Sequence, residues 1–316
     1  MCGVGLVDDN FGRTIAGRYE IRQRVGVGSL GAVYRAEQRG VHRKLAIKLL
    51  PDSPQRDPLA AERFRREGQV LVSLRSQHTI TTYEIGAEPD GTLFIAMELS
   101  PGKSLAHLLR KEGPQPWPRV LRILAGLCDS LGEAHALGII HRDLKPENIL
   151  VEDRATNPHF VKVSDFGLAK VIGSNLRISP VGQNVGSVEH ASPEQLLDRP
   201  IDGRSDLYGL GVLAFLLIAG AHPFSHARSF GDLVAAHVKH TPPRLSSVRR
   251  DVPADLDALI ACLLEKDPAR RYPDAPTLAA QLGLLLSGLP AEPGATIRVD
   301  EGEEDTFLAE IPKPGG

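Results

Sequence analysis

The chain has 316 residues, enough for one large core or two smaller ones, and its composition (42% hydrophobic, 24% charged) is ordinary for a globular protein. A net charge of −2 gives no reason to expect nucleic-acid binding, and neither a signal peptide nor an apolar run of about 20 residues is present. Three cysteines without C-x-x-C spacing predict reduced thiols in a cytoplasmic protein.

A glycine-rich stretch follows a short strand near the N-terminus. Residues 1–17 are weakly patterned and predict a flexible lead-in, whereas Arg18–Arg24 alternate as a strand. The next glycines have G-x-G-x-x-G spacing, which lets backbone amides approach phosphate oxygens; they are Gly26, Gly28 and Gly31. A dinucleotide-binding fold would continue as a helix, but β-type residues follow. The stretch therefore favours a hairpin folded over a nucleotide, with a plain tight hairpin as the alternative.

The strand predicted at Lys44–Leu50 contains one buried cation. Lys48 lies inside its apolar run, where a lysine is costly unless it is paired. Residues 59–74 then predict a helix, and Glu67 falls on its apolar stripe, three residues after Phe64. Because an inward-facing carboxylate needs a cation, we expect Glu67 to pair with Lys48; a solvated Glu67 is the alternative.

The remaining pattern divides the chain at residues 100–102. Strands are predicted before this Ser-Pro-Gly break, at Thr79–Gly86 and Leu93–Leu99. Helices are predicted after it, at Ser104–Lys111 (with Ser104 as N-cap), Pro118–Leu137, Asp206–Ala219, Asp255–Leu264 and Ala275–Leu286. Residues 291–316 carry seven acidic and two basic side chains and predict a disordered tail.

A dense polar stretch, residues 141–148, lies between two apolar runs. Asp143 is spaced to orient an acceptor hydroxyl, and Lys145 can offset charge on a moving phosphate. Asn148 and Asp165 offer the hard oxygen ligands that Mg²⁺ or Mn²⁺ prefers. Singly, each residue has a plainer explanation, since an Asp before Phe-Gly is commonly a turn residue. Their conjunction predicts transfer of the γ-phosphoryl group of ATP.

Together these motifs resemble those of the bacterial eukaryotic-like (Hanks-type) Ser/Thr protein kinases. The match runs from about Arg18 to about Leu286 and rests on Gly26–Val33, Ala46-Ile47-Lys48, Glu67, His141–Asn148, Asp165-Phe166-Gly167 and Ser192-Pro193-Glu194. The resemblance implies an α+β, bilobal protein-kinase fold. A small β-rich N-lobe with one key helix would span about 18–99, and a larger α-helical C-lobe about 100–288. Residues 1–17 and the acidic tail at 289–316 would lie outside the domain.

The resemblance also implies roles for individual residues. Lys48, Glu67, Asp143 and Lys145 would be catalytic, and Asn148 and Asp165 would hold the metal. ATP would be bound by Val25, Gly26, Gly28, Gly31, Val33, Ala46, Lys48, Met97, Glu98, Leu99 and Leu150. Among these, Met97 would be the gatekeeper, the backbone of Glu98 and Leu99 the hinge, and Val33, Ala46 and Leu150 would enclose adenine. Leu71, His141 and Phe166 would form an apolar stack, Asp206 would anchor the catalytic loop, and Glu194 would pair with Arg271.

One departure concerns activation. Arg142, before Asp143, resembles kinases that are switched on when a loop phosphate binds this arginine, yet the loop after Asp165 holds no threonine. We therefore hypothesise phosphorylation at Ser174 or Ser179, with a kinase that is active without it as the alternative.

The sequence thus predicts a cytoplasmic Ser/Thr protein kinase that phosphorylates protein substrates and itself in signalling. The alternatives are a pseudokinase scaffold and a small-molecule phosphotransferase, against which the long loop closed by Ser192-Pro193-Glu194 argues. Many bacterial members carry a transmembrane helix after the kinase domain; because this chain ends first, we expect a soluble protein. The tail is either plainly solvated or, phosphorylated at Thr296 or Thr306, docks a phosphothreonine-binding partner. Dimerisation is left open, and no nucleic acid is expected.

Overall fold

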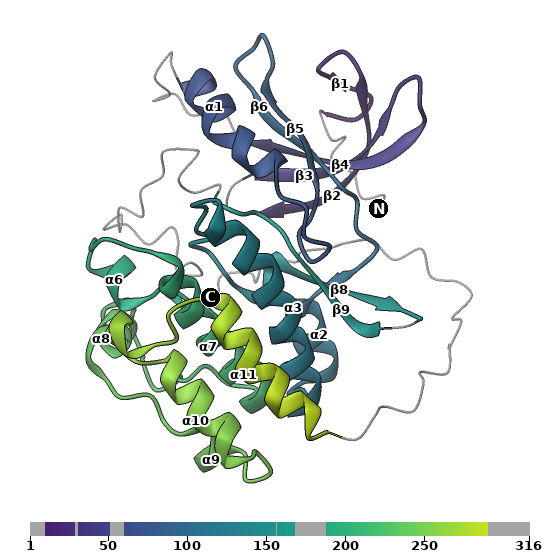
Figure 1. Ribbon diagram of the computed structural model, residues 1–316. Coiled ribbons are helices and arrows are strands. Elements are labelled where there is room, and N and C mark those ends of the chain that lie inside the picture. Colours follow the sequence, from purple (N-terminus) through teal and green to yellow (C-terminus); the bar gives the residue numbers. More distant parts are fainter. Residues whose placement is uncertain (1–9, 29–30, 51–59, 156, 168–187, 290–316) are drawn as a thin grey trace, which may run out of the picture. The chain divides into compact units, whose positions relative to one another are not determined.

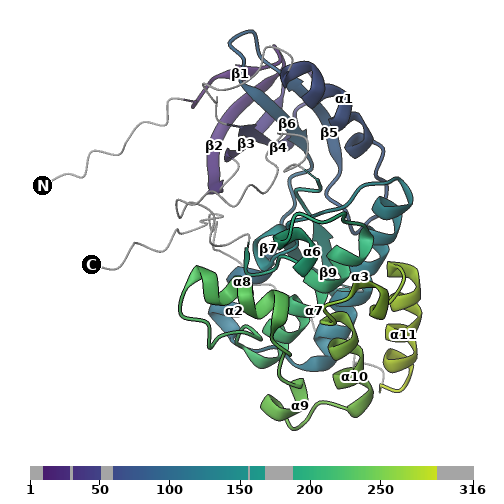
Figure 2. The same ribbon diagram turned by 90° about the vertical axis from the view of Figure 1, so that its left-hand side faces the viewer.

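The computed structural model describes residues 10–28, 31–50, 60–155, 157–167 and 188–289, without the side chains of a few of them, Glu67 included. These residues form two compact units (Figures 1 and 2). The first takes in the described residues up to 74 together with 80–100, and the second takes in 75–79 together with those from 101 onward. Apart from the short segment 75–79, the described chain passes from the first unit to the second at the Ser-Pro-Gly break of residues 100–102.

The first unit is an antiparallel sheet with one helix. Its strands follow the order β1-β2-β3-β4-β6-β5. Their bounds are β1 Thr14–Ile15, β2 Tyr19–Gly28, β3 Gly31–Gln38, β4 Arg43–Leu50, β5 Thr82–Ala87 and β6 Leu93–Met97. The helix α1, Ala60–Val72, runs beside β5 (Figure 1). There Gly68 allows close approach, because a Cβ on it would lie 2.7 Å from the Ile85 side chain.

The predicted lead-in at 1–17 is wrong for the part that the structure describes. Thr14–Ile15 forms β1, which pairs antiparallel with the start of β2. Ile15 is fully buried in the core of the sheet, against residues such as Tyr19 and Leu45. The pattern was too short to recognise, because two residues cannot show an alternation.

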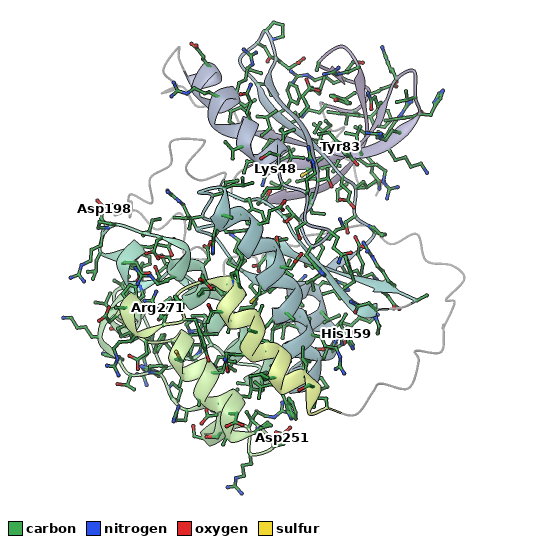
Figure 3. All side chains as sticks on the ribbon, viewed as in Figure 1. Lys48, Tyr83, His159, Asp198, Asp251 and Arg271 are labelled. Carbon is green, nitrogen blue, oxygen red and sulfur yellow. The ribbon has the colours of Figure 1, made fainter. Side chains whose placement is uncertain are left out.

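β4 is covered on both faces. Leu45, Ile47 and Leu49 point into the core cluster of the sheet. Ala46 and Lys48 lie on the opposite face because strand side chains alternate, and they are only 5% and 4% exposed. This explains why β4 reads as an almost continuous apolar run, and it places Lys48 on a buried surface of the first unit (Figure 3).

The second unit is mainly helical. Its helices are α2 Leu105–Glu112, α3 Trp117–Ala136, α6 Pro193–Leu196, α7 Gly203–Ala219, α8 Phe230–Lys239, α9 Leu245–Val248, α10 Ala254–Leu263 and α11 Ala275–Ser287, with 3-10 turns at η1 Pro146–Asn148 and η2 Pro268–Arg270. The predicted helices are all present, and Ser104 caps α2 by accepting from His107 N–H. α7 begins three residues before the predicted Asp206, because Asp202 supplies its N-cap. In the described part of the chain, no helix has the length and apolar character needed to span a membrane.

A small sheet of the second unit brings two polar segments together. Its order is β7-β8-β9, with β7 Lys103–Ser104, β8 Ile149–Arg154 and β9 Asn157–Val163. Ile149 pairs with Val163 across the β8–β9 hairpin, so Asn148 and Ser164 leave the same end of it. The end of the polar stretch and the Asp165-Phe166-Gly167 segment therefore meet at one end of the β8–β9 hairpin.

Candidate active site

The glycine-rich stretch is a hairpin, as the residues after it predicted. β2 and β3 pair antiparallel up to Gly28 and Gly31; residues 29–30 between them lie outside the described part. Gly31 has φ +134°, and a Cβ there would lie 2.1 Å from the backbone oxygen of Leu49 in β4. Only glycine fits this position, because the constraint comes from the backbone of the neighbouring strand. A strand-to-helix dinucleotide motif is excluded at this point.

Four of the predicted nucleotide-site residues share one face of the sheet. Val33 lies opposite Lys48, and Ala46 lies opposite Met97. Directly paired residues of antiparallel strands project to the same side, and Ala46 and Lys48 are two residues apart in β4. The face therefore places three apolar side chains around the buried lysine. Glu67 lies in α1, but its side chain is outside the described part, so its pairing with Lys48 stays a prediction.

The predicted hinge follows directly from β6. Glu98 N–H donates to the backbone oxygen of Thr81 (2.8 Å), and the Glu98 carboxylate accepts from Thr81 N–H (3.2 Å). The Glu98 N–H therefore makes its hydrogen bond within the first unit and does not donate to an adenine base. Leu150 belongs to β8 of the second unit, so its part in an adenine site with Val33 and Ala46 stays a prediction.

In the second unit, Asp206 of α7 holds the start of the polar loop. Its carboxylate accepts from the backbone N–H groups of His141 (2.8 Å) and Arg142 (2.9 Å), and His135 Nε2 lies 2.8 Å from it. These N–H groups lie outside any helix or strand, so a buried carboxylate is a suitable acceptor for them. Arg142 has φ +69°, a left-handed conformation that costs a non-glycine residue about 1–2 kcal/mol. The predicted anchoring by Asp206 is confirmed.

The loop gathers two of the predicted site residues, Lys145 and Asn148, around the carboxylate of a third, Asp143. Lys145 Nζ lies 2.7 Å from Asp143 Oδ2, and both side chains are partly accessible, at 14% and 18%. Asn148 Nδ2 donates to the Asp143 backbone oxygen (2.8 Å) and lies 3.3 Å from Oδ2. A cation and an amide thus fix the orientation of Asp143 while part of its carboxylate faces outward.

His141 connects this loop to the Asp165-Phe166-Gly167 segment. Its Nδ1 accepts from Asp143 N–H (3.3 Å), so the proton lies on Nε2, which donates to the Ser164 backbone oxygen (2.9 Å). The imidazole also meets the Phe166 ring edge-on, with centroids 4.7 Å apart. The expected contact between His141 and Phe166 is confirmed, with an edge-to-face geometry, whereas the contribution of Leu71, which is in the first unit, stays a prediction.

Two candidate metal ligands lie near the open end of the β8–β9 hairpin. Ser164 donates to the Asn148 backbone oxygen from both its N–H (2.9 Å) and its hydroxyl (3.1 Å), which holds the two strand ends together. Because Asn148 Nδ2 faces Asp143, its amide oxygen is directed elsewhere. Asp165 is half-buried and has φ +64°. One carboxylate and one amide oxygen suit a hard divalent cation such as Mg²⁺.

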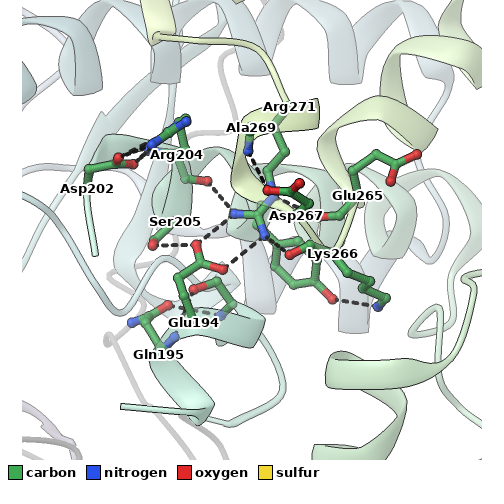
Figure 4. Close-up of polar contacts among 12 residues, drawn as sticks. Glu194, Gln195, Asp202, Arg204, Ser205, Glu265, Lys266, Asp267, Ala269 and Arg271 are labelled. Carbon is green, nitrogen blue, oxygen red and sulfur yellow. Dashed lines mark hydrogen bonds and ion pairs between the residues drawn. The ribbon is translucent and has the colours of Figure 1, made fainter. Parts of the chain in front are cut away.

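A buried ion pair joins Glu194 of α6 to Arg271. The Arg271 guanidinium donates to both carboxylate oxygens of Glu194 (2.7 and 2.9 Å), and Ser205 adds a hydrogen bond of 2.6 Å to the carboxylate (Figure 4). Arg271 also donates to the backbone oxygens of Arg204, Glu265 and Lys266. Burial alone would raise the pKa of Glu194, but the hydrogen bonds from Arg271 and Ser205 outweigh it and lower this pKa. The predicted Glu194–Arg271 pair is confirmed.

Two contacts of the site were not predicted. His135 on α3 reaches Asp206, and Gln195 on α6 donates to the Arg142 backbone oxygen. Both join residues more than 50 positions apart, and neither residue stood in a motif whose chemistry required it. The hypothesised phosphorylation sites Ser174 and Ser179, like Thr296 and Thr306 of the tail, lie outside the described residues.

Comparisons with known proteins agree with this geometry. The sequence pattern of the protein kinase domain family matches residues 19–281. The chain is 37% identical over 280 residues to the serine/threonine-protein kinase pkn3 of Myxococcus xanthus (87% of this chain, 51% of the relative). It is 35% identical over 285 residues to PknB of Mycobacterium leprae (88% and 44%). The solved PknI kinase domain of Mycobacterium tuberculosis superposes with a TM-score of 0.67 at 27% identity, covering 88% of this chain and 99% of that one.

The chain spans about half the length of the curated relatives that it matches. The matched segment nevertheless includes both units of the fold and every motif on which the candidate site rests. On these grounds the chain belongs to the protein kinase domain family, as a bacterial Hanks-type member.

Proposed function

We propose that the protein is an active Ser/Thr protein kinase that transfers the γ-phosphoryl group of ATP to hydroxyls of protein substrates. The observation that carries the proposal is the environment of Asp143. Its carboxylate is oriented by Lys145 and Asn148, and its loop is held from below by Asp206. A pseudokinase would have no need to keep a partly accessible carboxylate in this arrangement.

The chemistry follows from these positions. Asp143 accepts the proton of a Ser or Thr hydroxyl while the hydroxyl oxygen bonds to the γ-phosphorus, and the bond from that phosphorus to the bridging oxygen of ADP breaks. Lys145, 2.7 Å from Asp143, offsets negative charge on the transferred group. Lys48, buried in β4, binds phosphate oxygens of ATP, and the apolar face with Val33, Ala46 and Met97 receives adenine. The backbone of Glu98 and Leu99 and the glycine-rich hairpin complete the nucleotide site.

Asn148 and Asp165 would hold the divalent cation, Mg²⁺ or Mn²⁺. When bound there, the cation would supply charge neutralisation and alignment of the triphosphate. We propose that Glu67 of α1 pairs with Lys48 and positions it. The ATP requirement and the unpaired thiols of Cys128 and Cys262 support a cytoplasmic location for the domain.

The test is Asp143→Asn, a nearly isosteric change that removes the proton acceptor. We expect phosphate transfer to a generic protein acceptor with Mg²⁺ to fall by at least about a hundredfold, since general base catalysis contributes about 10²–10⁴. ATP affinity should stay within a factor of about two. The matched control, Asp153→Asn at an exposed position of β8, should retain wild-type activity.

Wild-type protein that binds ATP but transfers no phosphate would reject this proposal in favour of the pseudokinase.

Phosphosite mapping of wild-type and Asp143→Asn protein tests the proposed regulation by autophosphorylation. We propose that Ser174 or Ser179 carries the phosphate that Arg142 binds, and that Thr296 or Thr306 docks a phosphothreonine-binding partner. Sites that are modified equally in both proteins, or in neither, would contradict autophosphorylation there.

A further inference from the structure

Gln195 joins the short helix α6 to the catalytic loop. Within α6, its Oε1 accepts from Ser192 N–H (2.9 Å), and its own N–H donates to the Ser192 hydroxyl (3.3 Å). This reciprocal pair is a capping box, which Gln and Glu form equally well at the third helical position. Figure 4 shows Gln195 next to Glu194, whose ion pair with Arg271 fixes the helix in place.

The NH₂ group of the same Gln195 amide forms a hydrogen bond with the catalytic loop. Gln195 Nε2 donates to the backbone oxygen of Arg142 (2.9 Å). The orientation of the amide is determined by its partners, because a flipped amide would set N–H against N–H and oxygen against oxygen. One half-buried side chain therefore satisfies an N–H in α6 and a carbonyl in the loop.

The carbonyl that Gln195 holds belongs to the peptide plane linking Arg142 to Asp143. A peptide is planar, so its C=O and the following N–H turn together. Here the C=O is held by Gln195, and the N–H, that of Asp143, donates to His141 Nδ1. The preceding N–H of Arg142 is held by Asp206. The left-handed backbone of Arg142 is thus fixed on both sides by side chains.

We infer that Gln195 is a positioning residue for phosphoryl transfer, which sets the direction of the Asp143 carboxylate through the Arg142–Asp143 peptide. The inference rests on the proposed kinase function. It also gives α6 a physical route to the catalytic loop. A shift of α6 would release the Arg142 carbonyl and turn the peptide that carries Asp143.

Gln195→Glu separates positioning from capping. Glutamate keeps the capping box, but its carboxylate has no N–H for the Arg142 carbonyl and repels it. We expect kcat to fall by about five- to twentyfold, because the hydrogen bond is lost and the carboxylate repels the carbonyl oxygen. KM for ATP should stay within twofold and the melting temperature within about 2 °C. Gln195→Met, which loses both contacts, should lower kcat and the melting temperature together.

Leu197→Glu controls for the added charge, because Leu197 is 39% exposed and follows directly on α6. It should leave kcat unchanged. Hydrogen exchange of the 141–145 backbone should rise in Gln195→Glu and not in Leu197→Glu. Wild-type kcat in Gln195→Glu, or an equal loss in Leu197→Glu, would overturn the positioning role. If wild-type protein itself transfers no phosphate while exchange still rises in Gln195→Glu, the kinase proposal fails and the structural link stands.

Discussion

Arg271 illustrates how one buried side chain holds several segments together. Its side chain is fully buried and donates to a carboxylate and to three backbone oxygens, while its guanidinium stacks on the Tyr208 ring at 4.9 Å. An arginine suits this role because its planar fork offers five donors in fixed directions. The pair with Glu194 therefore orders the chain around α6 rather than simply adding a charge contact.

Replacing Arg271 should be strongly destabilising. Arg271→Met leaves the Glu194 carboxylate buried without its cation, which typically costs about 3–5 kcal/mol of unfolding free energy. Urea unfolding at pH 7 measures this cost. Arg270→Met is the matched control, since Arg270 is 69% exposed and its ion pair with Glu265 should be worth at most about 1 kcal/mol. Similar midpoints for the two variants would contradict the structural role of the buried pair.

At the scale of elements, the glycine-rich hairpin depends on close packing of backbones. β2 and β3 meet at Gly28 and Gly31, and β4 lies against Gly31 so tightly that no side chain fits. The glycine spacing that suggested phosphate binding thus has a second cause, the approach of a third strand. Sequence alone could not separate the two, because both demand the absence of a Cβ.

Gly31→Ala tests this packing. We expect a loss of roughly 2–4 kcal/mol, from the clash with the Leu49 backbone oxygen and the strained φ. Gly40→Ala is a matched control: Gly40 also has positive φ (+85°), but a Cβ there meets nothing within 4 Å, so only about 1–2 kcal/mol should be lost. Thermal unfolding compares the two, and equal losses would show that the clash is relieved.

For the molecule as a whole, three buried or half-buried histidines make stability depend on pH. Burial lowers the pKa of His190 and of His237 to about 3, and it also lowers the pKa of His222. Nearby positive charge, Lys145 for His190 and Lys266 for His237, acts in the same direction. Both ring nitrogens of His190, and Nε2 of His237, lack hydrogen-bond partners among the described residues. These rings are therefore neutral in the folded protein.

The direction in which stability changes with pH follows from proton uptake on unfolding. Below about pH 6.5 the unfolded chain binds protons that the folded chain does not, so stability falls as the pH falls. Burial of His190 and burial of His237 should each cost about 1 kcal/mol of stability between pH 6.5 and 5.5. Chemical unfolding from pH 5.5 to 7.5 measures this slope. His190→Leu should make it shallower, whereas His240→Leu, at an exposed histidine, should not; an unchanged slope in His190→Leu would contradict the role of burial.

The kinase fold class came through the family resemblance. The sequence pattern by itself determined the division of the chain into a strand-rich and a helical part, the order of the main helices and strands, and the residue types at the site. It did so because buried strands, amphipathic helices and phosphate-handling residues each impose a local pattern, as in Lys44–Leu50 and residues 141–148. Short elements such as β1 escaped prediction because two residues carry no period. Residue pairs such as Glu194 with Arg271 came only through resemblance to a family.

Only the tertiary structure decided how Asp143 is held. The anchoring by Asp206, 63 residues after Asp143, was expected only through the family resemblance, and the contact of Gln195, 52 residues after Asp143, was not predicted at all. A hydrogen bond needs donor and acceptor within about 3 Å, and that proximity is produced by folding rather than by spacing along the chain. The residue types in the motifs therefore determine the chemistry of the site. The packing of α6 and α7 around the loop sets the direction in which the Asp143 carboxylate points.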